Sequence, residues 1–269
     1  MNYSLVSEEE RAHIAPELVG RAHVLVTDGI TQWVVKHKPG SVHEEKRDLL
    51  GFLLGHSFAN VAEVRLLTEE EHLQVRLLSA KDATSTNDNT FLVRVAGSYS
   101  IEELPCKTVE QATAAELVYS TWIRRRDAHV YNRSYLNGIP VFYDFSIAFL
   151  GEPHLADIAR FFALPPTDYG QGGAWKIKLI ENYITLLTRG EVPVTNGGGN
   201  HYIKDIGIFK EEVKNAIKII QETMNQPLLE KYIAESNFSS PESETILNFL
   251  LTNLASIESD TNLMLQRIF

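Results

Sequence analysis

Four residues of the kinds that serve acid–base and metal chemistry fall close together near the middle of the chain. Residues 124 to 146, "RRRDAHVYNRSYLNGIPVFYDFS", contain Asp127, His129, Asn132 and Asp144. Carboxylate and amide oxygens are the hard ligands that Mg²⁺ prefers, and a positioned carboxylate can orient or deprotonate a hydroxyl. Phosphoryl transfer requires this combination, together with a cation that holds the nucleotide phosphates. The stretch therefore predicts phosphoryl-transfer chemistry.

The spacing suggests how these groups divide the work. Asp127 and Asn132 lie five positions apart in a predicted loop, so one can face the acceptor hydroxyl while the other faces a metal ion. Asp144 follows the predicted strand "VFY" and offers a second oxygen ligand. Because each residue type also serves as an ordinary turn former, cap or strand end, the prediction depends on the set and on no single member.

A cation for the phosphates is available in the first part of the chain. Lys36 ends the β-rich run "QWVVK", and a predicted helix over residues 43 to 55 carries Glu44 and Glu45 in its first turn. A helical carboxylate can hold a strand lysine in place for the α- and β-phosphates. We expect Glu44 or Glu45 to be that partner.

The first hundred residues predict a small sheet with one helix. Two β-rich runs, residues 22 to 27 and 30 to 36, meet at Asp28-Gly29, a pair that favours a tight hairpin turn. Further strands are predicted for "VAEVRLL", "HLQVRLLSA" and "NTFLVRVAG".

The remainder predicts mainly helix. Thr108 and Gln111 fit a capping box that opens a helix, and "GIPVFYDFS" reads as an apolar strand. Apolar residues at helical spacing then recur in "IFKEEVKNAIKIIQETM" and "SPESETILNFLLTNLASI". Residues 170 to 173 and 197 to 199 are glycine-rich and predict loops. The fold class expected is α/β of the α+β kind, with an antiparallel sheet preceding a larger helical part.

Composition limits the partners. The formal charge is −10, from 25 basic and 35 acidic residues, which argues against a dedicated nucleic-acid-binding protein. Cys106 is the only cysteine, so no intrachain disulfide can form, and we assign it no role. No window approaches the roughly 18 apolar residues that a membrane span needs. We expect a cytoplasmic protein, and we read the basic residues 124 to 126 as a helix C-terminus that the helix dipole favours.

With these residues in place, the chain resembles a known family. "DAHVYN" followed by "YDFS" looks like the D-x-H-x-x-N and D-F-G motifs of the atypical kinases that include the phosphatidylinositol 3- and 4-kinases and the HipA-like bacterial kinases. "WVVK" looks like the strand with the nucleotide lysine, and "FLVRVAG" like the strand that leads to the hinge. The resemblance covers residues 20 to 150.

The resemblance implies a two-lobed protein kinase-like fold, with an N-terminal lobe over residues 1–100 and a C-terminal lobe over 101–269, that binds ATP and Mg²⁺. By position it implies that Asp127 is the catalytic aspartate, that His129 assists it, and that Asn132 and Asp144 are the metal ligands. It also implies that Lys36 binds the phosphates and that the backbone of Val95 and Gly97 meets adenine.

Several alternatives stay open. The acceptor implied by HipA-like kinases is a protein serine or threonine, whereas a lipid or small-molecule hydroxyl would suit other relatives. The triplet ends in Ser146 instead of glycine, Ala128 stands where lipid kinases have arginine, and Asp28-Gly29 replaces a glycine-rich loop. A pseudokinase that acts by binding a partner is therefore the alternative to an enzyme. The small size of the chain resembles that of a bacterial protein. A regulatory protein partner also stays open.

Overall fold

The computed structural model describes residues 2–14, 24–36, 42–78, 90–125, 133–145, 148–149, 203 and 205–268. The strands are β1 Ser4–Leu5, β2 Leu25–Thr27, β3 Gln32–Lys36, β4 Val64–Leu66, β5 Phe91–Arg94, β6 Arg133–Leu136 and β7 Ile139–Phe142. The helices are α1 Glu8–Ile14, α2 Val42–Gly55, α3 Glu69–Leu78, α4 Val109–Ile123, α7 Ile206–Thr223, α8 Gln226–Glu235 and α9 Ser240–Ile268, with short 3-10 turns η2 Ala96–Ser98 and η3 Ile101–Glu103.

The first part of the chain is built on a five-stranded antiparallel sheet of order β1-β2-β3-β5-β4. The predicted hairpin joins β2 to β3. The Asp28 carboxylate accepts the backbone N–H groups of Ile30 and Thr31 at 3.0 and 2.8 Å, and Gly29 takes a φ of +91°. An Asp-Gly pair suits this turn because the aspartate bonds the backbone locally and glycine adopts positive φ without strain. The turn sets the register in which Lys36 lies opposite Phe91 on β5.

One predicted strand is wrong. The run "HLQVRLLSA", residues 72 to 80, was expected to be extended, but residues 69 to 78 form α3. The reason is a capping box: Thr68 N–H donates to the Glu71 carboxylate at 3.0 Å, and Glu71 N–H donates to Thr68 Oγ1 at 3.3 Å. The first hundred residues therefore contain α1 and α3 in addition to the one helix that was expected.

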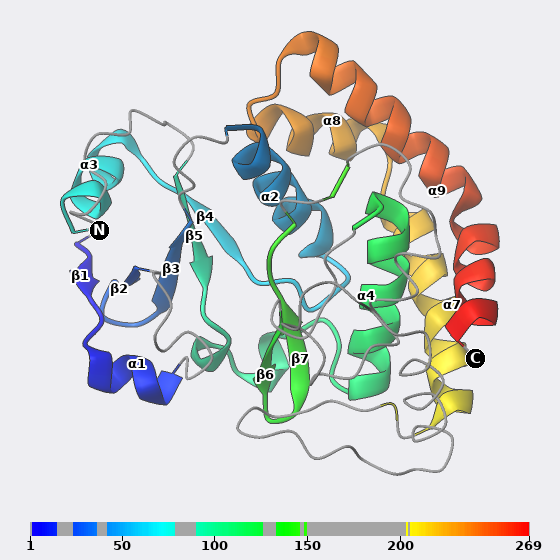
Figure 1. Ribbon diagram of the computed structural model, residues 1–269, viewed down its shortest axis with the longest axis horizontal. Coiled ribbons are helices and arrows are strands. Elements are labelled where there is room, and N and C mark those ends of the chain that lie inside the picture. Colours follow the sequence, from blue (N-terminus) through cyan, green and yellow to red (C-terminus); the bar gives the residue numbers. More distant parts are fainter. Residues whose placement is uncertain are drawn as a thin grey trace, which may run out of the picture.

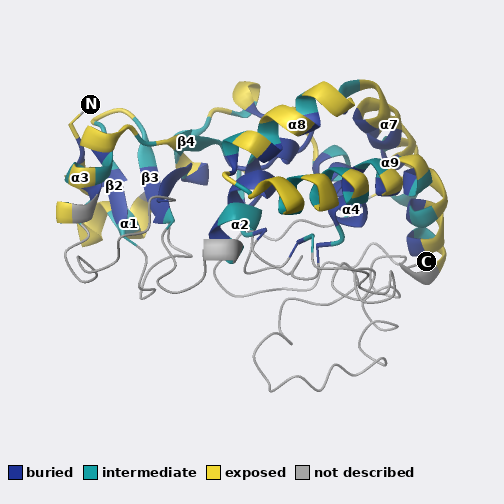
Figure 2. Ribbon diagram, turned by 90° about the horizontal axis from the view of Figure 1, so that it is seen from above, coloured by how far each residue is buried: buried dark blue, intermediate teal, exposed yellow. Residues whose placement is uncertain are grey.

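Helix α2 lies between the sheet and the helices of the second part (Figure 1). One side of the sheet buries Val26, Trp33 and Leu92 in a small separate cluster with Val75 of α3. The main core is continuous from α2 through α4 to the C-terminal helices. Figure 2 shows the buried sides of α2 and α4 within the molecule and the exposed outer faces of α8 and α9. Movement of α2 would therefore disturb both parts at once.

The β6–β7 hairpin is fastened to the segment that leaves α2. Phe142 N–H donates to the Asn60 carbonyl at 2.7 Å, and Ala62 N–H donates to the Phe142 carbonyl at 3.1 Å. The fully buried Asn60 side chain donates to the carbonyls of Cys106 and Pro140 at 3.0 and 3.2 Å and accepts the Cys106 N–H at 2.8 Å. This one amide thus joins three segments that are distant in sequence.

The second part of the chain is mainly helical, as predicted. Thr108 caps α4 by accepting the Gln111 N–H. Trp122 Nε1 donates to the Leu250 carbonyl of α9, and Asn253 of α9 returns a bond to the Trp122 carbonyl, both at 2.9 Å. The expected fold class, an antiparallel sheet followed by a mainly helical part, is confirmed. A lobe boundary at residue 100 stays a prediction.

Candidate active site

Lys36 lies at the end of β3 and reaches toward α2. Its Nζ is 3.2 Å from Asp48 Oδ2, and its side chain is 15% exposed. Burial alone would lower the pKa of Lys36, but the carboxylates of Asp48 and Asp144 outweigh it and raise the pKa above its ordinary value. The lysine therefore remains a cation at neutral pH, as a phosphate-binding group must.

Asp48 connects this lysine to the strand end that carries Asp144. One carboxylate oxygen holds Lys36, and the other accepts the Phe145 N–H at 2.5 Å. Burial raises the pKa of Asp48; the charge of Lys36 opposes this rise, and the charge of Asp144 adds to it. Asp48 thus links β3, α2 and the residues after β7 in one contact chain.

The prediction that Glu44 or Glu45 holds Lys36 is wrong by one helical turn. Glu44 and Glu45 stand in the first turn of α2, whereas the ion pair of Lys36 is with Asp48 in the next turn. Asp48 shares a helix face with Gly51 and Phe52, and that face turns toward the core. The signal in the sequence was an aspartate directly before "LLGFLLG", where a solvated charge would be out of place.

Asp144 is held in an unusual backbone conformation beside these two residues. Its φ is 65°, in the left-handed region that aspartate enters more readily than most residues. Phe145 is fully buried, edge-on to Phe52 and Tyr119 at centroid distances of 5.0 and 5.5 Å. The anchored ring fixes where the chain turns, and so places Asp144 close enough to Lys36 for each charge to affect the other.

The glycine that permits this packing is Gly51 of α2. A Cβ added there would lie 2.2 Å from Cβ of Phe145. The Tyr119 hydroxyl also donates to the Gly51 carbonyl. The helix and the residue after Asp144 can therefore approach each other only because position 51 has no side chain.

Two of the three consecutive arginines are described, and neither is a simple solvated helix end. Arg124 pairs with Asp260 of α9 at 2.6 Å. Arg125 is fully buried and turns inward to the carbonyls of Tyr143 and Asp144. Sequence reasoning missed this inward role, because nothing in a run of arginines distinguishes the buried member.

The segment after β5, where adenine contact was expected, forms the turn η2. Val95 N–H donates to the Gln32 carbonyl at 2.9 Å, and the Val95 carbonyl accepts the Ser98 N–H at 2.9 Å. Gly97 lies inside the turn. A ligand that used the Val95 N–H would therefore have to replace a bond that the protein already makes.

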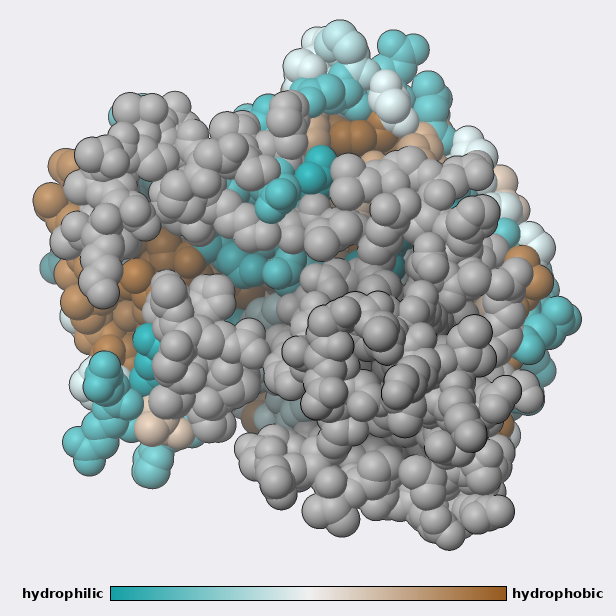
Figure 3. Space-filling view, in the orientation of Figure 1, coloured by the Kyte–Doolittle hydropathy of each residue, from teal (hydrophilic) through white to brown (hydrophobic). Residues whose placement is uncertain are grey.

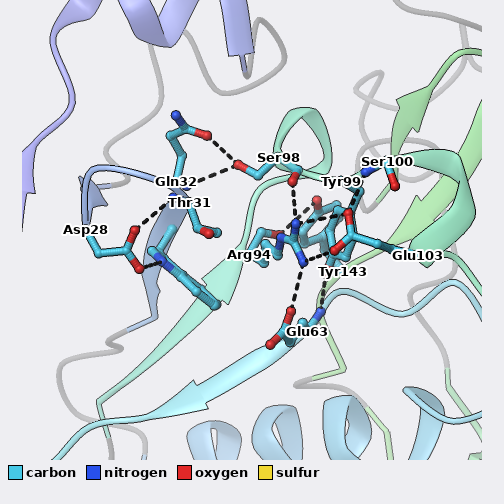
Figure 4. Close-up of polar contacts among 11 residues, drawn as sticks. Asp28, Thr31, Gln32, Glu63, Arg94, Ser98, Tyr99, Ser100, Glu103 and Tyr143 are labelled. Carbon is cyan, nitrogen blue, oxygen red and sulfur yellow. Dashed lines mark hydrogen bonds and ion pairs between the residues drawn. The ribbon is translucent and has the colours of Figure 1, made fainter. Parts of the chain in front are cut away.

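Arg94 fixes this segment from beside it (Figure 4). Its guanidinium contacts the carboxylates of Glu63 and Glu103 at 3.2 and 2.9 Å and stacks over the Tyr99 ring, 4.1 Å from the centroid. The Tyr143 hydroxyl donates to the Arg94 carbonyl at 3.3 Å. The expected hinge is thereby tied to the residue that precedes Asp144.

The remaining predicted site residues, Asp127, His129 and Asn132, lie outside the described residues, as do Ser146 and the glycine-rich loops. Within the described ranges, no group of three or more His, Cys, Asp or Glu side chains is arranged to hold a metal ion. Asp144 nevertheless offers the hard oxygen that Mg²⁺ prefers. None of the helices in the described part of the chain combines the length and hydropathy needed to cross a membrane.

The described residues define a mixed α/β protein in which a sheet lysine, a helix aspartate and an aspartate after β7 converge. No protein-family model matches the chain, and no curated protein does. Among solved structures it is similar to the proinflammatory kinase CtkA of Helicobacter pylori, with 12% identity, 91% of this chain and 90% of that chain covered, and a TM-score of 0.40.

Proposed function

We propose that this chain is an ATP- and Mg²⁺-dependent phosphotransferase of the HipA-like or phosphatidylinositol 3- and 4-kinase-like kind. The observation that supports it is the convergence of Lys36 from β3, Asp48 from α2 and Asp144 from the segment after β7. Here the ammonium of Lys36 is close to the carboxylates of Asp48 and Asp144. Asp144 is held in place because the N–H of the next residue, Phe145, donates to Asp48.

The charges of the site favour a nucleotide together with a metal over a nucleotide alone. Two carboxylates outnumber the one ammonium, so a bare polyphosphate would be repelled by Asp144. Bound Mg²⁺ would supply positive charge that neutralises the charge developing on the phosphate oxygens. Asp144 would be its ligand in the described part of the site, Asn132 the second ligand, and Lys36 would hold the α- and β-phosphates.

The reaction proposed is transfer of the γ-phosphoryl group to a hydroxyl, most favourably that of a serine or threonine on a protein. Asp127 would orient and accept the proton of that hydroxyl, with His129 assisting. The formal charge of −10 favours a protein acceptor over a lipid head group, because anionic membrane surfaces attract basic segments. A cytoplasmic, bacterial setting is part of the same proposal.

The experiment is a thermal-shift measurement with ATP, with and without Mg²⁺, on the wild type and on Asp144→Asn. Asparagine is the appropriate substitution because, unlike alanine, it tolerates a φ of 65°. At a ligand concentration of 100 Kd, binding stabilises the folded state by about 2.7 kcal/mol, or roughly 5 to 10 °C for a chain of this size. We expect a Mg²⁺-dependent shift in the wild type that Asp144→Asn loses. No shift at millimolar MgATP would contradict the proposal.

A pseudokinase that binds a protein partner is the second candidate. It is favoured by the backbone of Val95, which precedes η2 and already makes hydrogen bonds within the protein. It is also favoured by apolar side chains exposed on α3, where Leu73 and Leu77 are 60% and 71% exposed. Figure 3 shows apolar surface at the end of the molecule that carries the sheet. This candidate predicts that the protein binds nucleotide without transferring phosphate, or binds no nucleotide. Once binding is established, a measurement of phosphate transfer from ATP separates the pseudokinase from the phosphotransferase.

A further inference from the structure

Arg125 occupies a position that its charge would ordinarily forbid. It follows the left-handed cap residue Arg124 at the end of α4, and its side chain is fully buried. Its Nη1 donates to Glu116 Oε1 at 3.1 Å, and both side chains are 1% exposed. An apolar pair of similar volume often stabilises a core equally well or better, so core packing does not explain why charges stand here.

The guanidinium makes contacts that an apolar side chain could not make. Its Nη2 donates to the Tyr143 carbonyl at 2.6 Å, its Nε donates to the Asp144 carbonyl at 3.1 Å, and its Cζ lies 4.6 Å from the centre of the Phe145 ring. Three consecutive residues are thus held by one planar group. Glu116 neutralises the charge of the guanidinium and accepts a hydrogen bond from its Nη1.

These contacts bear on the backbone conformation of Asp144. With a φ of 65°, this residue is in a region that non-glycine residues hold only when their surroundings impose it. Arg125 holds the carbonyls on one side of the turn, and Asp48 holds the Phe145 N–H on the other. Between them, the two residues determine the direction in which the Asp144 carboxylate leaves the backbone.

We propose that Arg125, kept in place by Glu116, is a positioning residue that fixes the Asp144 carboxylate for metal binding. The functional half of this statement rests on the proposed function of Asp144. Lysine cannot substitute, since a single ammonium cannot hold two carbonyls and a carboxylate in one plane. The role belongs to the shape of the guanidinium more than to its charge.

The test compares Arg125→Lys with the matched control Arg124→Lys. The Arg124 guanidinium bonds Asp260 and Asn253 of α9. Amide hydrogen exchange reports the turn directly, and Mn²⁺ affinity in the presence of ATP, measured by electron paramagnetic resonance, reports the metal site. We expect the Phe145 amide to exchange at least tenfold faster in Arg125→Lys than in the control. We also expect Mn²⁺ to bind at least tenfold more weakly, with ATP affinity in the absence of metal unchanged.

The two readouts separate the failures. If the wild-type protein binds no Mn²⁺ in the presence of ATP, the proposed function fails, and the metal-binding half of the inference fails with it. Faster exchange of the Phe145 amide in Arg125→Lys would still support control of the turn by Arg125. If the wild type binds Mn²⁺ and Arg125→Lys retains both Mn²⁺ affinity and Phe145 protection, Arg125 is structural only and the inference is overturned. Should Arg125→Lys not fold, Glu116→Gln, which preserves the shape and one acceptor, is subject to the same two outcomes.

Discussion

Replacement of Gly51 by alanine tests whether α2 and Phe145 pack as closely as the site requires. The added Cβ would lie 2.2 and 2.4 Å from Cβ and Cγ of Phe145, whereas carbon atoms settle at about 3.5–4.0 Å. The two segments must therefore separate by more than about 1 Å. Such a movement would strain the bond from Phe145 N–H to Asp48.

The sign of the effect makes this test sharp. Alanine in a helix interior is ordinarily more stable than glycine by about 1 kcal/mol, whereas overpacking a core costs about 1–3 kcal/mol. The overpacking cost should fall at the upper end of this range, because the clash is with Cβ of Phe145 beside the backbone, so we expect Gly51→Ala to lower the free energy of unfolding by up to about 2 kcal/mol. The control is Gly207→Ala on α7, where the atom within 4 Å of an added Cβ is Asp205 Oδ1 at 3.1 Å; it should be neutral or slightly stabilising.

The assay is urea unfolding followed by tryptophan fluorescence, for which the buried Trp122 is a probe. If Gly51→Ala is as stable as Gly207→Ala, α2 does not meet Phe145 closely, and the placement of Asp144 argued from that contact is refuted. A loss of stability in Gly51→Ala alone supports it.

Two further predictions concern the supports of the site. Asn60→Ala should lower the free energy of unfolding by about 2–4 kcal/mol in urea titrations, because it leaves the Cys106 N–H and two carbonyls unpaired in the core; a loss below about 1 kcal/mol would show that Asn60 does not join the three segments. Burial raises the pKa of the Cys106 thiol to about 12, so the folded protein should resist alkylation at pH 9 and react once unfolded, and rapid labelling of folded protein would contradict this. Because the raised pKa is a property of the folded state, this thiol contributes stability that is present below about pH 9 and is lost as the pH rises toward 12.

Local chemistry made much of the fold predictable. The Asp28-Gly29 turn and the Thr108 cap act over a few residues, so the sequence displays them directly. The same rule was available for α3, where Thr68 and Glu71 form a capping box, but the alternation of Leu73, Val75 and Leu77 resembled a strand. There, a local cap decided the structure against the apolar pattern.

The site was predictable in its outline and not in its connections. Residue type and order sufficed to predict that Lys36 and Asp144 come together, while their roles in binding phosphate and metal stay predictions. The choice of Asp48 over Glu44 or Glu45 depends on how far α2 advances beside β3, which is a tertiary distance. The inward turn of Arg125 depends likewise on the position of the β7 end. Such contacts join residues more than ten positions apart, and no periodicity in the sequence records them.

The most direct test of the central claim, that Lys36 is the phosphate-binding cation of a nucleotide site, is isothermal titration of MgATP into three proteins. These are the wild type, Lys36→Met and the control Lys218→Met, whose lysine is 74% exposed on α7. We predict measurable binding to the wild type, binding at least tenfold weaker to Lys36→Met, and no change in Lys218→Met. No binding to the wild type, or equal affinity in all three proteins, would contradict the claim that Lys36, Asp48 and Asp144 form a nucleotide site.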